Sequence, residues 1–452
     1  MTARSVALET IRAVSDSDAY ANLLLPRAIA RAGLSTADAA LATELTYGTL
    51  RRQGTYDAII ALAADRPVGE IDPPILDVLR LGVHQLLATR IASHAAVNES
   101  VALARTLGGR ASSGFVNAVL RRVSRDTPGE WLERVEHTAR SDDERLSLSS
   151  AHPVWVIRAF RRALAAEGRA DELDDLLRAD NAAPRVAMAA LPGLAGIPDA
   201  RVHTTYSPIG FFPGGGDPEP VVRESGGRLR VQDEGSQLAA LALTRAAPVR
   251  PGERWLDLCA GPGGKTAVLA AEALAGGAIL EANEPVPARA GLVRQALAGV
   301  PAEIPVSEED GRVRASAAGG TYDRILVDAP CTGLGALRRR PEARWRKHPA
   351  DVPELTELQR GLVTAAVGAL RPGGLLAYVT CSPHLAETAA VLAEVRRDAG
   401  DELEELDARA VLQSFALAPL DLPVPVDGSG RAQLWPHRHN TDAMFISLLR
   451  RR

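Results

Sequence analysis

The fold is decided by the stretch Trp255-Leu256-Asp257-Leu258-Cys259-Ala260-Gly261-Pro262-Gly263-Gly264-Lys265-Thr266. It predicts a short apolar strand, then a glycine-rich turn, then a helix that begins near Lys265. The glycines of the turn let the backbone bend sharply and approach a ligand without a Cβ in the way. In an open α/β sheet such a turn lies beyond the carboxyl end of a strand, where ligands bind. A phosphate-binding P-loop would need glycine at the position of Cys259, so that alternative is disfavoured.

Two later stretches repeat the pattern of a strand followed by a cysteine. Tyr322–Asp328 is followed by Ala-Pro-Cys331-Thr-Gly, and Leu375–Thr380 is followed by Cys381-Ser-Pro. The chain has three cysteines, and each stands where one of these three strands ends. If the strands are parallel neighbours, all three thiols gather at one edge of the sheet. A buried structural role is the usual alternative for cysteine, but this placement favours a function for Cys331 and Cys381.

The strings DLCAGPGGKT, DAPCTG and TCSP, in this order, resemble those of the RNA cytosine-C5 methyltransferases that use S-adenosyl-L-methionine. The resemblance covers about the last half of the chain. The first third resembles the helical RNA-binding domain of the antitermination factor NusB. The combination is similar to the bacterial Sun/Fmu methyltransferases, which act on small-subunit (16S) ribosomal RNA. S-adenosyl-L-methionine is therefore the expected cofactor, and ribosomal RNA is the expected partner.

The resemblance also implies roles for single residues. Cys381 would be the nucleophile and Cys331 would assist product release. DNA enzymes with the same chemistry use the Pro-Cys position, so the reverse assignment stays open. Asp328 would contact the cytosine edge or the cofactor, and Lys265 would assist substrate binding or activation. The expected cofactor-binding residues are Cys259, Ala260, Gly261, Pro262, Gly263, Gly264, Lys265, Glu284, Asp310 and Asp328.

Two acids in this set follow predicted strands. Ile279–Asn283 reads as a strand that ends at Glu284, where an acid typically binds ribose hydroxyls. Glu281 is close enough to leave open which of the two holds the ribose. Asp310 matches the acid that lies near the adenine in the resembling enzymes. The chain departs from their pattern at Thr332, where serine is common, and at Glu387-Thr388, where Glu-Asn is common.

The length of 452 residues predicts more than one hydrophobic core. We expect a multidomain protein, with an all-α NusB-like domain at 1–130 and a small α+β RNA-binding subdomain at 146–235. A doubly wound, Rossmann-like α/β methyltransferase domain is expected at 236–452. The polar residues 126–145 read as a linker, and Ala443–Leu449 as a closing antiparallel strand.

Charge suggests where RNA would bind. The net charge is −4, yet residues 1–125 carry 14 arginines against 11 acidic residues. Contact with RNA must therefore use local patches. The first of two candidate patches consists of Arg51, Arg52, Arg121, Arg122 and Arg125. The alternative is that these arginines only stand at solvated helix ends and bind no RNA. The second follows Cys331 and is expected to bind phosphate; it consists of Arg338, Arg339, Arg340, Arg344, Arg346 and Lys347.

The remaining expectations concern compartment and alternatives. Three scattered cysteines predict no disulfide framework, and the sequence shows neither a signal core nor a membrane-spanning run. We expect a cytoplasmic monomer without metal, since His437 and His439 lack further ligands at zinc spacing. A tRNA cytosine-C5 methyltransferase is one alternative. An RNA-binding assembly factor without catalysis is another, although both cysteines and Asp328 are present.

Overall fold

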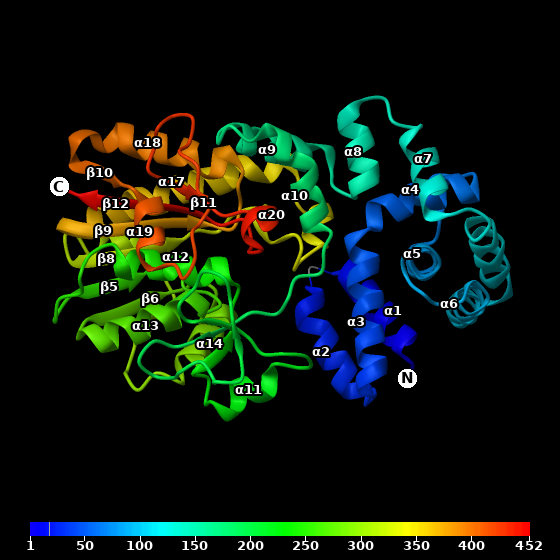
Figure 1. The fold of residues 1–452 in the computed structure, drawn as a ribbon, viewed down its shortest axis with the longest axis horizontal. Coiled ribbons are helices and arrows are strands. Elements are labelled where there is room, and N and C mark those ends of the chain that lie inside the picture. Colours follow the sequence, from blue (N-terminus) through cyan, green and yellow to red (C-terminus); the bar gives the residue numbers. More distant parts are fainter. Residues whose placement is uncertain (18) are drawn as a thin grey trace. The chain divides into compact units, whose positions relative to one another are not determined.

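The computed structural model describes residues 1–17 and 19–452, and its chain forms two compact units (Figure 1). The helical unit comprises Met1–Arg158, Asp180–Ala183 and Leu337–Arg346. The sheet unit comprises Ala159–Ala179, Pro184–Ala336 and Lys347–Arg452. No helix within the described residues is long and apolar enough to cross a membrane.

Several helices of the helical unit begin at residues that favour a helix start. Ser35 caps a helix by accepting a hydrogen bond from Asp38 N, and Pro73 begins another. Gly109 interrupts the longest helix with a φ of 72°. The helices bury one large apolar core and a smaller separate cluster. Their bounds are α1 (Ala3–Asp16), α2 (Ala21–Ala32), α3 (Thr36–Arg51), α4 (Gln53–Ala64), α5 (Pro73–Ala88), α6 (Ser93–Val123), α7 (Pro128–Glu136) and α8 (Asp142–Ser150).

Residues 126–145, which the sequence predicts to be a linker, contain α7 and the start of α8. Thr127 and Glu130 form a capping box at the start of α7. Trp131 is buried in the helical core, and its Nε1 donates a hydrogen bond to Val123 O. Only one narrow face of this helix is apolar, so its composition resembles that of a loop. The expectation of a linker was wrong for this reason.

Residues Leu337–Arg346 lie in the helical unit although they belong to the second half of the chain. Within this segment α16 (Ala343–Arg346) contains Arg344, which is fully buried. Arg346 donates hydrogen bonds to the carbonyl oxygens of Val14, Ser17 and Ala19. Arg338 is also buried. The expectation that this arginine run binds phosphate is therefore wrong for these three side chains, because the helical unit already occupies or encloses them.

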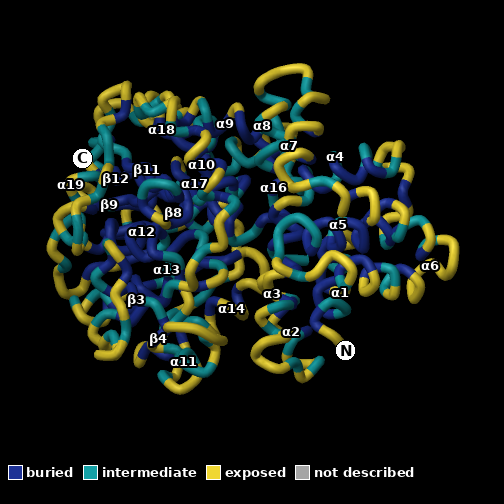
Figure 2. Tube along the Cα trace, turned by 45° about the vertical axis from the view of Figure 1, so that its right-hand side comes forward, coloured by how far each residue is buried: buried dark blue, intermediate teal, exposed yellow. Residues whose placement is uncertain are grey.

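The sheet unit contains a main sheet with the strand order β10-β12-β9-β8-β5-β6-β7, and β11 pairs with β12 outside this order. Neighbours from β9 to β7 are parallel, whereas β12 runs antiparallel to β9 as predicted. It does not close the sheet, because β10 pairs with its other side. The central strands are buried on both faces, as is usual for a parallel sheet (Figure 2). The strand bounds are β5 (Arg254–Asp257), β6 (Ile279–Asn283), β7 (Val306–Ser307), β8 (Tyr322–Asp328), β9 (Leu370–Thr380), β10 (Leu403–Leu406), β11 (Ala432–Gln433) and β12 (Phe445–Arg451).

Two separate apolar clusters cover the two faces of this sheet, which confirms the doubly wound α/β class. One cluster includes side chains from α12 (Glu234–Arg245), α13 (Gly264–Gly276), α14 (Pro287–Leu297) and α19 (Ala408–Phe415). The other includes side chains from α15 (Gly311–Ser316), α17 (Val352–Ala369) and α18 (Ala389–Ala399).

A smaller antiparallel sheet of order β2-β3-β1-β4 precedes the main one along the chain. Its strands are β1 (Met188–Ala190), β2 (Val202–His203), β3 (Gly210–Phe212) and β4 (Leu229–Val231). The helices in this part of the chain are α9 (Val154–Ala165), α10 (Leu173–Asp180) and α11 (Glu219–Glu224).

Candidate active site

Two of the three cysteines meet at the carboxyl edge of the main sheet. β8 and β9 are parallel neighbours, and Asp328 pairs with Val379 in their register. The loops that follow bring Cys331 Sγ to 3.4 Å from Cys381 Sγ. Cys259 follows the adjacent strand β5 but packs against an apolar cluster, and burial raises the pKa of its thiol well above the ordinary value. Cys331 and Cys381 therefore form a pair of thiols in contact, whereas Cys259 is a packed thiol outside this pair.

Lys265 and Asp328 form an ion pair at the same edge. Lys265 Nζ lies 2.7 Å from Asp328 Oδ2, and the two side chains are 10% and 25% exposed. Burial by itself lowers the pKa of Lys265, but the charge of Asp328 and the hydrogen bond to it outweigh burial and raise that pKa. The ammonium group thus stays charged beside a carboxylate that remains partly open to solvent.

The glycine turn is fixed by Glu284, which follows β6. Glu284 Oε2 accepts a hydrogen bond from Gly261 N at 3.1 Å, and Arg289 Nη2 donates to Gly261 O at 2.8 Å. A Cβ on Gly261 would overlap the Glu284 carboxylate. Glu281 points elsewhere and pairs with Arg254. Of the two acids that the sequence left open, only Glu284 contacts the glycine turn.

Comparison with known proteins identifies the family. Residues 245–450 match the model of the 16S rRNA methyltransferases RsmB/F, and residues 1–125 match that of the NusB family. The chain is 48% identical to the putative methyltransferase Rv1407 of Mycobacterium tuberculosis, over 99% of this chain and 96% of that protein. It is 30% identical to the probable ribosomal RNA small subunit methyltransferase B of Synechocystis, over the full length of both. The chain belongs to the RsmB/F family of rRNA methyltransferases.

Solved structures support the fold. The crystal structure of PH0851 superposes with a TM-score of 0.79 and covers 99% of both chains at 21% identity. The structure of NSun6 from Pyrococcus horikoshii superposes with a TM-score of 0.52, over 65% of this chain and 98% of that chain, at 17% identity. Both likenesses concern the fold. As a member of the RsmB/F family, the chain is an S-adenosylmethionine-dependent methyltransferase.

The edge of the sheet in this RsmB/F protein suits that cofactor. Glu284 and Asp310 follow the neighbouring strands β6 and β7, and Asp328 ends β8, so three carboxylates belong to the edge at which an α/β sheet binds its ligand. The turn bears no side chain at Gly261 or Gly263, and a Cβ on Gly263 would overlap Ala296. The backbone of the turn can therefore approach a ligand closely.

The loop that holds Asp310 is tied to the end of β6. Asn283 binds the backbone N and O of Glu309 at 3.2 and 3.0 Å, which places Asp310 at the same edge as Glu284. Hydrogen bonds from Arg312 lower the pKa of Asp310 to about 2. Asp310 is thus an ionised, 41% exposed carboxylate, and both of its oxygens accept hydrogen bonds from Arg312.

One acid of this site was missed at the level of sequence. Asp257, the last residue of β5, is 1% exposed, and its Oδ2 accepts a hydrogen bond from Thr266 Oγ1 at 2.8 Å. Burial raises its pKa to about 7, with a smaller contribution from the charge of Asp328. Its position directly before the glycine turn was the available signal, because perturbed carboxylates cluster at functional sites.

The predicted RNA patch of the NusB domain loses one member. Arg51 is buried and donates a hydrogen bond to Arg338 O, because the segment Leu337–Arg346 packs onto it. Arg52, Arg121, Arg122 and Arg125 are exposed. Arg122 also contacts Asp65 at 3.0 Å. The prediction of an RNA patch therefore rests on four arginines.

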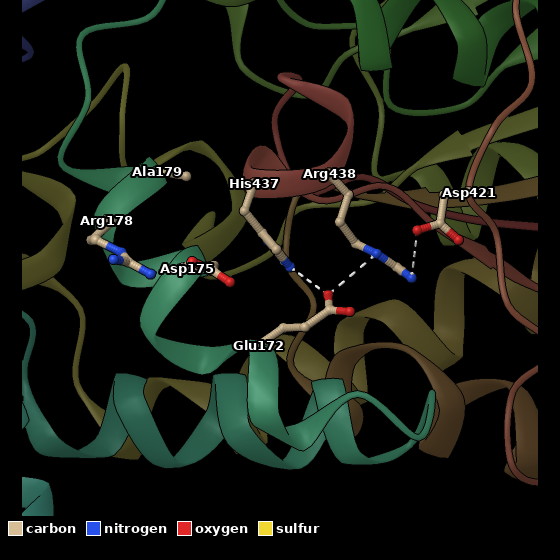
Figure 3. A pocket seen from close by; sticks show the side chains of 7 residues that line it. All are labelled: Glu172, Asp175, Arg178, Ala179, Asp421, His437 and Arg438. Atoms are coloured by element: carbon tan, nitrogen blue, oxygen red, sulfur yellow. Dashed lines mark hydrogen bonds and ion pairs between the residues drawn. The ribbon is translucent and has the colours of Figure 1, made fainter.

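His437 and Arg438 line a pocket of mixed charge in the sheet unit (Figure 3). His437 Nε2 lies 2.8 Å from Glu172 Oε2, and Arg438 Nη2 lies 3.0 Å from Asp421 Oδ2. No group of His, Cys, Asp or Glu within the described part of the chain is arranged to hold a metal ion. The pocket contains none of the predicted site residues, and its ion pairs join α20 (Pro436–His439) to Glu172, just before α10, and to Asp421.

Proposed function

We propose that this enzyme methylates C5 of a specific cytosine in 16S ribosomal RNA through a covalent bond between Cys381 and C6. The observation that carries the proposal is the pair of thiols, 3.4 Å apart, beside the Lys265–Asp328 ion pair. A methyltransferase that acts on a nucleophilic oxygen or nitrogen has no need of a thiol pair at this position. Membership of the RsmB/F family supports ribosomal RNA as the substrate class.

The chemistry requires a thiolate because C5 of cytosine is a poor nucleophile. Addition of the Cys381 thiolate to C6 moves electron density onto C5, which can then accept a methyl group. S-adenosylmethionine, when bound, supplies an electrophilic methyl group on its sulfonium. Loss of the C5 proton to a base then allows the Cys381–C6 bond to break and restores the aromatic ring. The target base must leave its stack to reach the two thiols.

The environment of the cysteines supports a division of roles. The pKa of Cys331 is raised well above its ordinary value, first by its hydrogen bond with Cys381 and then by burial. Either sulfur can be the donor in the contact between the two thiols, and a proton on Cys331 would leave Cys381 free to attack. Lys265 and Asp328 would orient the cytosine edge. Glu284, Asp310 and the turn from Cys259 to Gly264 would hold the cofactor.

Single cysteine variants test the proposal on unmodified 16S rRNA. Cys381→Ala should show neither methylation nor an RNA adduct, since the attacking thiolate is lost. Cys331→Ala should still attack but release poorly, so RNA should remain attached and give a slow band on a denaturing gel. The double variant is the control and should lose that band. An adduct in Cys381→Ala would reverse the roles, and full methylation by both single variants would contradict the covalent mechanism.

The substrate is tested in cells. Mapping 5-methylcytosine in RNA from a strain without this protein should show one mark missing from 16S rRNA. Loss of a mark from tRNA instead would favour a tRNA enzyme, and no lost mark would favour a binding role.

A further inference from the structure

A buried carboxylate lies between the two cysteine loops. Glu387 is 0% exposed and belongs to the turn that follows β9. Its Oε1 accepts a hydrogen bond from Thr332 N at 2.7 Å, and its Oε2 accepts from Thr332 Oγ1 and from Ser382 Oγ at 2.5 and 2.6 Å. Thr332 directly follows Cys331, and Ser382 directly follows Cys381. One side chain thus holds the neighbour of each thiol.

Further hydrogen bonds fix this arrangement from both sides. Gln359 Nε2, on α17, donates to Glu387 Oε1 at 3.2 Å and to Pro330 O at 2.8 Å, and Pro330 directly precedes Cys331. Tyr378 OH donates to the backbone oxygen of Glu387 at 2.5 Å. The hydroxyl oxygens of Thr332 and Ser382 lie 3.0 Å apart. The loops therefore cannot separate without breaking several buried hydrogen bonds.

The network requires an acceptor at Glu387. Two N–H groups and two hydroxyl groups converge on its two oxygens. An ionised carboxylate accepts at both oxygens and donates at neither, so it satisfies all four donors. Hydrogen bonds to a charged acceptor are also the stronger kind. A neutral amide in this place would offer one acceptor oxygen and turn an NH₂ group towards donors.

We propose that Glu387 is a positioning residue for the reaction, which sets the separation of the Cys331 and Cys381 thiols by binding the residue after each of them. The inference rests on the proposed covalent mechanism. It assigns no contact with the substrate to Glu387. The carboxylate acts through Thr332 and Ser382, so its loss changes the placement of the thiols and leaves the glycine turn intact.

The variant Glu387→Gln keeps the size of the side chain and removes one acceptor. We expect the rate constant of methylation at saturating RNA and cofactor to fall by about 100-fold, the order expected when reacting groups shift by about 1 Å. The KM for RNA and the affinity for S-adenosylhomocysteine should stay within about twofold, because the binding groups are unchanged. The matched control is Glu394→Gln, an exposed carboxylate on α18 that should leave the rate unchanged.

A second variant covers the case in which Glu387→Gln does not fold. Ser382→Ala removes one hydroxyl from the network, and we expect a smaller rate loss of about 10-fold with unchanged KM. In the Cys331→Ala background, both changes should slow the appearance of the covalent RNA adduct by the same factors. Melting curves and S-adenosylhomocysteine binding show that each variant is folded.

The outcomes separate this inference from the proposed function. If the parent enzyme with Cys331→Ala forms no adduct, the covalent mechanism itself fails. If that adduct forms and the Glu387→Gln and Ser382→Ala changes leave its rate within twofold, only the positioning role is wrong. An equal loss of rate and of cofactor affinity in folded Ser382→Ala would also overturn it, because a general structural role predicts that pattern.

Discussion

Replacing Arg344 tests whether the segment after the Cys331 loop is a structural part of the helical unit. Arg344 is fully buried, and its guanidinium donates to the backbone oxygens of Arg51, Ala151 and Asp180 and to the side-chain oxygen of Asn181. Burial lowers its pKa to about 10, so it still carries its charge at neutral pH. Arg344→Ala would leave three backbone carbonyls and one amide oxygen buried without this partner.

The loss can be estimated from these contacts. Each buried polar group that loses its partner destabilises the fold by about 1–3 kcal/mol. The variant no longer has to bury the guanidinium charge, and this gain offsets part of the total loss. A net destabilisation of about 3–5 kcal/mol is the value typical of breaking a buried polar cluster. For a unit of about 150–250 residues each kcal/mol lowers Tm by about 2–4 °C, so the first thermal transition should fall by about 6–20 °C.

Differential scanning calorimetry measures this shift. The control is Arg145→Ala, because Arg145 is 48% exposed and lies 3.7 Å from Asp142. That variant should lose less than about 1 kcal/mol. If Arg344→Ala melts like the control, Arg344 is not buried by the helical unit, and phosphate binding by this arginine run would be restored as an explanation.

Two further predictions concern RNA binding and pH. Neutralising the exposed Arg121 and Arg122 together should reduce the salt dependence of RNA binding, because fewer counterions are released; an unchanged slope would mean that these arginines face solvent only. His152 is buried, and burial lowers its pKa from 6.5 to about 4, so the unfolded chain takes up this proton first as the pH falls. The helical unit should lose about 3 kcal/mol of stability between pH 6.5 and 4, and His152→Gln should remove this part of an acid titration followed by circular dichroism.

The sequence predicted the main sheet well because its signals are local. Tyr322–Asp328 and Ile279–Asn283 are strands with the predicted bounds, since short runs rich in apolar residues between glycine and proline residues leave few alternatives. The cysteines that follow β5, β8 and β9 could also be read directly. Where the signal was mixed, as in α7 with one buried tryptophan among charged residues, the prediction failed.

The sequence by itself therefore determined the class of the fold and the edge of the sheet at which we propose the chemistry, because parallel strands bring their carboxyl ends together. It could not give the 3.4 Å contact between Cys331 and Cys381, which depends on how two loops 50 residues apart are tied. The buried contacts of Glu387 and Arg344 were equally inaccessible. A carboxylate or a guanidinium looks the same in the sequence whether it is solvated or buried, and only the groups that pack around it in the tertiary structure decide which.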